Sequence, residues 1–66
     1  MHIVKYTESE RGWGGEIWYN SFDSEEEARM EVRDVNGRLP KDHVPDYYIQ
    51  AEYMGEMDTI PKGYKF

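Results

Sequence analysis

The sequence predicts an α+β protein in which a three-stranded antiparallel sheet carries one helix on one face. Three observations lead there. A capped amphipathic segment lies near the middle of the chain, β-rich segments occupy residues 2–7, 16–22 and 46–57, and the order is therefore strand, strand, helix, strand (ββαβ). With 66 residues the chain is expected to form a single compact domain, 1–66, whose residues 58–66 are a C-terminal tail.

The first two strands are expected to form an antiparallel hairpin. Residues 2–7 (HIVKYT) and 16–22 (EIWYNSF) favour strands, and the polar, glycine-rich residues 8–15 (ESERGWGG) between them predict a long loop. Glycines flank Trp13 and permit positive φ there, so this indole is expected at the loop tip. It either inserts into a partner or folds back onto the sheet.

The helix is the strongest local prediction. One apolar stripe has helical spacing and is expected to face the sheet, at Ala28, Val32, Val35 and Leu39. The start is Asp23 or Ser24, since each has a glutamate three residues later, as in a capping box. Gly37 is the natural stop, and Pro40 prevents continuation.

Residues 46–57 (DYYIQAEYMGEM) alternate most regularly, and Gly55 is expected to end or bulge this strand. A right-handed crossover then gives the spatial order 2-1-3. The sheet face away from the helix is expected to carry Trp18, Tyr48 and Met54. Such an apolar face needs a cover, which is the tail, a second copy or a partner.

Composition excludes several functions. The chain has no cysteine, so disulfides and thiolate sites are absent. Its net charge of −6 is the wrong sign for direct nucleic-acid binding and suits a basic partner. No apolar stretch approaches the roughly 18 residues of a membrane span, and no secretory signal is recognisable, so a cytoplasmic location is expected.

Five carboxylates are the main candidate site: Asp23, Glu26, Glu27, Glu31 and Asp34. On a helix, Glu27 to Glu31 spans about 6 Å and Glu31 to Asp34 about 4.5 Å. These separations are comparable to phosphate spacing, so the helix is a candidate mimic of DNA. The alternative is a solvated helix face, because Arg29 and Arg33 interrupt the negative field.

Aromatic side chains are the second candidate. Trp13 and Trp18 are the predicted apolar anchors for a partner, with Tyr48 beside them on the open face. Enzyme and metal sites find no support. The group His2, His43, Asp42 and Asp46 has no ligand spacing, and the serines lack the context of a nucleophile. The sequence thus predicts no enzyme, metal or cofactor.

Two segments carry a resemblance: FDSEEEARMEVRDVNGRLP (22–40) and PDYYIQAEYMG (45–55). They resemble small acidic proteins of tailed phages, of the host-takeover or anti-defence type. The resemblance implies a phage-encoded inhibitor that acts in the host cytoplasm on a host protein, including restriction or CRISPR machinery. It transfers no site residue.

The functional prediction is therefore a non-enzymatic inhibitor that binds a basic host protein through its acidic helix and aromatic loop. The main alternative is a homodimeric accessory module that pairs through the open sheet face. A third is a protein that sequesters a small molecule in a cavity between subunits.

Overall fold

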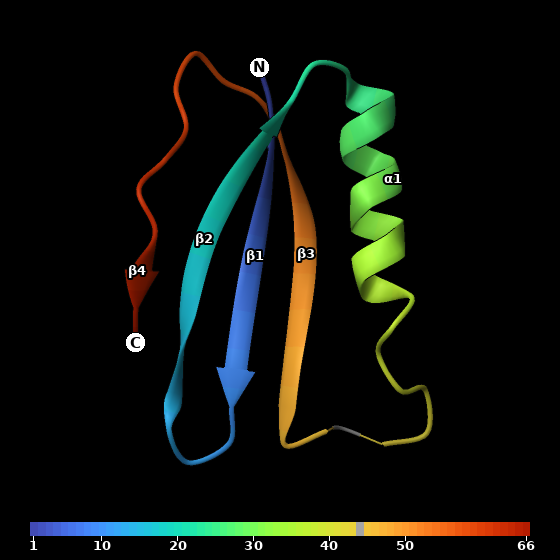
Figure 1. Ribbon diagram of the computed structural model, residues 1–66, viewed down its shortest axis with the longest axis vertical. Coiled ribbons are helices and arrows are strands. Elements are labelled where there is room, and N and C mark those ends of the chain that lie inside the picture. The colour runs from blue at the N-terminus through green and yellow to red at the C-terminus, as the bar shows by residue number, and fades with distance from the viewer. Residues whose placement is uncertain (44) are drawn as a thin grey trace.

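The computed structural model describes residues 1–43 and 45–66 as a four-stranded antiparallel sheet with one helix (Figure 1). The elements in chain order are β1 (His2–Glu10), β2 (Gly14–Phe22), α1 (Glu25–Asn36), β3 (Tyr47–Glu56) and β4 (Tyr64–Lys65). The strands lie in the order β3-β1-β2-β4. The predicted α+β class and the order of the first three strands are therefore confirmed.

The prediction of only three strands is wrong, because the tail supplies a fourth. β4 pairs with the outer edge of β2, where Gly15 and Phe66 exchange backbone hydrogen bonds of 2.8 and 2.9 Å (Figure 1). The tail thus extends the sheet at its edge. A two-residue strand has no alternating pattern, so the sequence held no signal for it.

The hairpin loop is much shorter than predicted. β1 and β2 stay paired as far as Glu10 and Gly14, so only residues 11–13 lie between them. The N–H of Trp13 donates to the carbonyl of Glu10 at 3.0 Å, and Gly12 and Gly14 have φ of +84° and +83°. These positive values are what glycine permits in a tight turn. Trp13 is at the tip, as predicted.

The helix begins and ends where the sequence places it. Of the two predicted starts, the structure selects Ser24, whose Oγ accepts a hydrogen bond from the N–H of Glu27 at 3.2 Å. The N–H of Gly37 donates to the carbonyl of Arg33 at 2.8 Å and closes the last turn. Within the described residues, no helix has the length and apolar character that a bilayer span requires.

β3 contains the bulge that Gly55 suggested. Ile3 pairs with Gly55 but Val4 pairs with Tyr53, so Met54 is an extra residue in the ladder. Gly55 has φ of +95°, which a glycine adopts without strain.

The core lies between α1 and one face of the sheet. Val4 and Tyr6 of β1, Ala28 of α1 and Ala51 of β3 are buried together there. The half-buried residues around them are Trp18, Phe22, Val32, Val35, Ile49 and Tyr53. The helix stripe therefore faces the sheet as predicted.

The prediction that Trp18 lies on the sheet face away from the helix is wrong. Trp18 pairs with Tyr6 across β1 and β2, and it packs against the same core cluster as α1. The strand register gives the far face a mixture of apolar and polar residues, namely Ile3, Lys5, Thr7, Ile17, Tyr19, Tyr48, Gln50 and Glu52, and it places Trp18 on the helix side instead. The hydrophobic period of β2 left both faces possible, since Ile17 on the other face is also buried.

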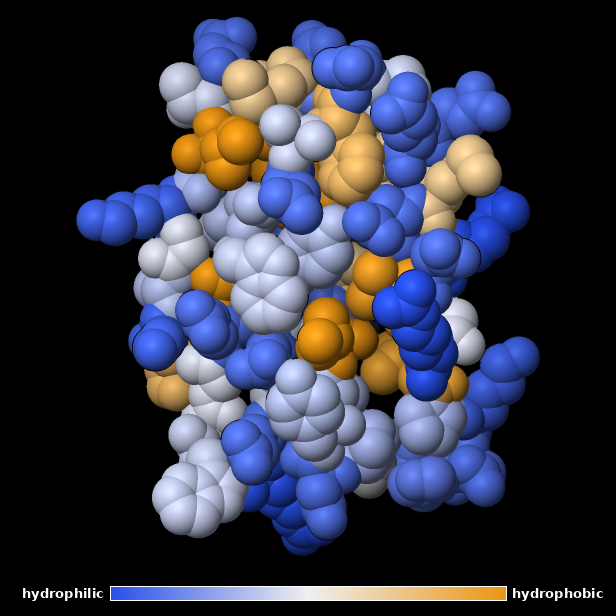
Figure 2. Space-filling view, viewed as in Figure 1, coloured by the Kyte–Doolittle hydropathy of each residue, from blue (hydrophilic) through white to orange (hydrophobic). Residues whose placement is uncertain are grey.

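α1 covers only part of its face of the sheet. It packs mainly against β3 and much less against β1 and β2 (Figure 1). Figure 2 shows apolar side chains gathered over β3 and the adjoining part of α1, with charged side chains around them. An uncovered region therefore remains beside the second half of the helix.

Candidate functional site

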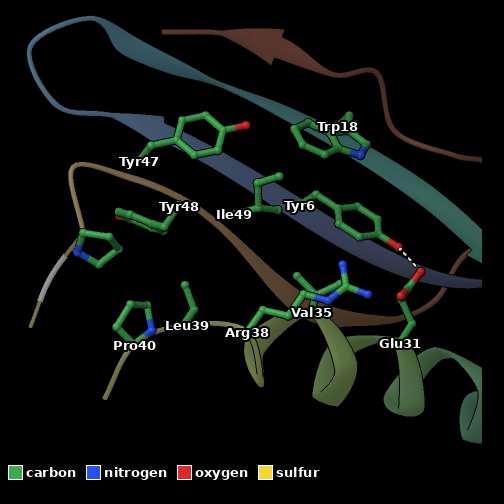
Figure 3. A pocket seen from close by; sticks show the side chains of 11 residues that line it. Tyr6, Trp18, Glu31, Val35, Arg38, Leu39, Pro40, Tyr47, Tyr48 and Ile49 are labelled. Carbon is green, nitrogen blue, oxygen red and sulfur yellow. Dashed lines mark hydrogen bonds between the residues drawn. The ribbon is translucent and has the colours of Figure 1, made fainter. Parts of the chain in front are cut away.

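A groove of about 440 Å³ opens between the sheet, the second half of α1 and the loop that follows it (Figure 3). Its size is within the range of ligand sites in proteins. Most of its lining residues are aromatic, aliphatic or proline, and two are charged. The full lining is Tyr6, Trp18, Glu31, Val35, Arg38, Leu39, Pro40, Pro45, Tyr47, Tyr48 and Ile49.

Two stacked rings form the sheet side of the groove. Tyr6 and Trp18 are neighbours on β1 and β2, with ring centroids 5.4 Å apart and an interplanar angle of 4°. Tyr6 is only 5% exposed, and its hydroxyl donates to Glu31 Oε2 at 2.9 Å (Figure 3). Burial and, next, this hydrogen bond to a carboxylate raise the pKa of Tyr6 to about 12.

The opposite side is built from the end of α1 and the proline loop. Val35 and Leu39 point toward the sheet, and Pro40 lies beside Tyr48 (Figure 3). Arg38 follows Gly37 at the end of the helix and reaches over the groove toward Tyr6 (Figure 3). Among the described residues, no carboxylate lies within salt-bridge distance of its guanidinium.

Tyr47 connects the groove to the hairpin tip. Its hydroxyl donates to Glu8 Oε2 at 2.9 Å, and this bond raises the pKa of Tyr47. Tyr47 also lines a shallow hollow together with Trp13 and Arg11. The backbone N–H of Arg11 donates to the carbonyl of Asp46 at 2.7 Å and holds the tip against the start of β3.

The structure brings three of the eight predicted site residues together. Trp18, Tyr48 and Glu31 all line the groove, although they come from β2, β3 and α1. Trp13 lies at the neighbouring hollow and is 82% exposed. The indole is therefore in solvent, and the predicted arrangement in which it folds back onto the sheet is wrong.

The other four predicted residues stay on the outer surface. Asp23, Glu26, Glu27 and Asp34 are exposed, and the described residues offer none of them an ion pair. The helix cation Arg29 instead pairs with Glu25 at 2.8 Å and lies over the ring of Tyr53, 4.6 Å from its centroid. The hydrogen bond from Arg29 lowers the pKa of Glu25.

Glu31 differs from the other helix carboxylates. It is half-buried, and its Oε2 accepts the Tyr6 hydroxyl inside the groove. The spacing of Glu27, Glu31 and Asp34 is thus present along the helix, but its middle carboxylate is oriented toward the sheet. The exposed negative surface on this stripe consists of Glu27 and Asp34.

The histidines lie apart from each other. His2 Nδ1 is 2.9 Å from the Tyr53 hydroxyl, while His43 Nδ1 is 2.8 Å from Asp42 Oδ1. Asp46 is paired with Arg11 at 3.5 Å. Within residues 1–43 and 45–66, no three histidine or carboxylate side chains approach closely enough to hold a metal ion.

Sequence reasoning missed Tyr6, Tyr47 and Arg38 as groove residues. The alternation of β3 puts Tyr47 on the same face as Ala51, and that parity was available. Prolines 40 and 45 bracket the loop before β3, which favours an extended path over the sheet edge. Tyr6 and Arg38 gave no signal, since their places depend on how α1 lies on the sheet.

Comparisons with family models, with curated proteins and with solved structures found no match for this chain.

Proposed function

We propose that this protein is a non-enzymatic inhibitor that binds a basic protein through the groove and the adjacent acidic helix. The observation that supports it most is the meeting of Trp18, Tyr48 and Glu31 in one open groove. Aromatic residues around a desolvated hollow are typical of binding hot spots. The exposed Trp13 beside Tyr47 extends the same surface.

The outer carboxylates steer the approach of the partner. Glu27 and Asp34 face solvent, and the described residues provide no cation to neutralise them. Rim charges of this kind accelerate association with an oppositely charged protein more than they tighten the final complex. Two parts of the proposal, that the partner is a host protein and that the chain is phage-encoded, rest on the resemblance of segments 22–40 and 45–55 to phage proteins.

Charge reversal of Glu27 and Asp34 to lysine tests the proposal. The matched control is Glu52→Lys with Asp58→Lys, which reverses two exposed acids away from the groove and equally brings the net charge from −6 to −2. The immobilised wild type and the control should capture a basic protein from a bacterial lysate, and the Glu27 and Asp34 variant should lose it at physiological salt.

Inhibition supplies the decisive measurement. The captured protein, once purified, should lose its activity when the wild type is added and keep it with the Glu27 and Asp34 variant. Equal capture by that variant, or unaltered activity of the captured protein, would contradict the proposal. A salt-insensitive dimer in sedimentation would instead favour the homodimeric module.

A further inference from the structure

The polar groups of the groove determine which ligand it can accept. The buried side-chain nitrogen and oxygen atoms of the described residues are all hydrogen-bonded, so the unpaired ones in the groove face solvent. Lining residues with such groups include Trp18, Arg38 and Tyr48. The Trp18 indole and the Arg38 guanidinium can only donate, whereas the Tyr48 hydroxyl can donate or accept.

One negative charge lies in the same space, because Glu31 is the one carboxylate of the described lining. Glu31 Oε2 already accepts the Tyr6 hydroxyl, which leaves Oε1 for a ligand. The donors of Trp18 and Arg38 therefore suit a ligand with carbonyl oxygens, and Glu31 suits a ligand with one positive charge.

We infer that the groove binds a proline-rich peptide segment with one adjacent Lys or Arg. Proline has no N–H, and a polyproline II segment makes no internal hydrogen bonds, so its carbonyls are available to donors. Proline rings pack on tyrosine and tryptophan faces, as in other aromatic grooves that read such segments. The basic side chain would reach Oε1 of Glu31. This inference rests on the proposed function and names the chemistry of the partner's contact segment.

The shape of the site agrees with an extended ligand. The lining residues follow β3 from Tyr47 to Ile49. They continue to Tyr6 on β1 and to Glu31 on α1 (Figure 3).

The experiment measures peptide binding by tryptophan fluorescence. In a Trp13→Phe background Trp18 is the sole tryptophan, because the chain has two, and its emission reports on the groove. The probe is a synthetic peptide of about nine residues with prolines at every third position and one arginine. Matched peptides carry alanine for each proline or glutamate for the arginine.

The arginine peptide should change the Trp18 emission saturably, and both matched peptides should bind about tenfold more weakly or worse. Tyr48→Ala and Arg38→Ala should weaken binding to a similar degree. The control is Tyr64→Ala, which removes a tyrosine from β4 at the opposite edge of the sheet and should leave the Kd unchanged.

Three results would overturn the inference. They are no saturable binding of the arginine peptide up to about 1 mM peptide, equal affinity for the peptide with alanine in place of proline, or an unchanged Kd in both groove variants. A dimer that loses peptide binding at high protein concentration would show a second copy in the groove and would also reject it. If the peptide does not bind but the protein still inhibits its captured partner, the inference about the peptide is rejected and the proposed function stands. If the peptide binds but no captured partner is inhibited, the proposed function is rejected and the inference about the peptide stands.

Discussion

The side chain of Asn36 takes the place of a neighbouring strand at Ala51. Asn36 Nδ2 donates to the carbonyl of Ala51 at 3.0 Å, and the N–H of Ala51 donates to Asn36 Oδ1 at 2.8 Å. Ala51 is 4% exposed and lies on β3, an edge strand of the sheet. The amide therefore satisfies a buried strand edge and fixes the last turn of α1 beside the groove.

Replacement of Asn36 by alanine should lower the free energy of unfolding by about 1–3 kcal/mol, because both backbone groups of Ala51 lose their partner. Urea denaturation measures the loss, and hydrogen exchange at the Ala51 amide should become faster. Gln50→Ala, an exposed position next along β3, is the control and should remain within about 0.5 kcal/mol of the wild type. Equal stability of the two variants would show that the amide pair contributes nothing.

Alkaline pH should destabilise the protein through Tyr6. Its pKa is about 12 when folded and about 10 in an unfolded chain, so the neutral phenol is favoured by folding. Its contribution is complete below pH 10 and is lost as the pH rises from 10 to 12, by about 2–3 kcal/mol in total. Tyr6→Phe, which cannot ionise, should flatten this part of the curve of unfolding free energy against pH.

Tyr47→Phe is the comparison for that measurement. The pKa of Tyr47 is raised in the same direction, but the side chain is 53% exposed and solvent screens it, so Tyr47→Phe should flatten the alkaline slope less than Tyr6→Phe does. If Tyr6→Phe and the wild type lose stability in parallel above pH 10, the buried hydrogen bond to Glu31 is not the cause.

Ser24→Ala should cost about 1 kcal/mol of unfolding free energy, because the N–H of Glu27 loses its acceptor. Asp23→Ala should cost less, since the structure gives the cap to Ser24 and leaves Asp23 exposed. Thermal unfolding of both variants provides the comparison. A larger loss for Asp23→Ala would move the helix start by one residue.

The two tryptophans should differ in their access to solvent. Trp13→Phe leaves Trp18, which is half-buried against Tyr6, and its emission should be blue-shifted and weakly quenched by acrylamide. Trp18→Phe leaves Trp13, which is 82% exposed and should be quenched strongly. Similar quenching of both variants would contradict the placement of Trp18 beneath the groove.

Local chemistry allowed much of the fold to be predicted. The stripe from Ala28 to Val35, the cap at Ser24 and the stop at Gly37 define α1 from residues within a few positions of each other. The regular alternation of β3 and its bulge at Gly55 were also local. Strand order then followed from the connection rules, which need only the sequence of elements.

The candidate site was predicted in part. Trp18, Tyr48 and Glu31 were among the predicted site residues and line one groove, but this meeting place was not foreseen, because Trp18 was assigned to the wrong face. Ile17 and Trp18 are consecutive residues of β2 on opposite faces, and both bury apolar surface. Periodicity alone therefore did not decide which face of β2 meets the helix.

The sequence by itself determined the helix with its caps, the three long strands and the negative charge, since each depends on neighbouring residues or on composition. Tertiary structure decided which side of β2 faces α1, where the tail pairs, and that Glu31 turns inward to Tyr6 while Glu27 and Asp34 remain outside. These outcomes depend on contacts between residues distant in the chain, whose free energies no local pattern records.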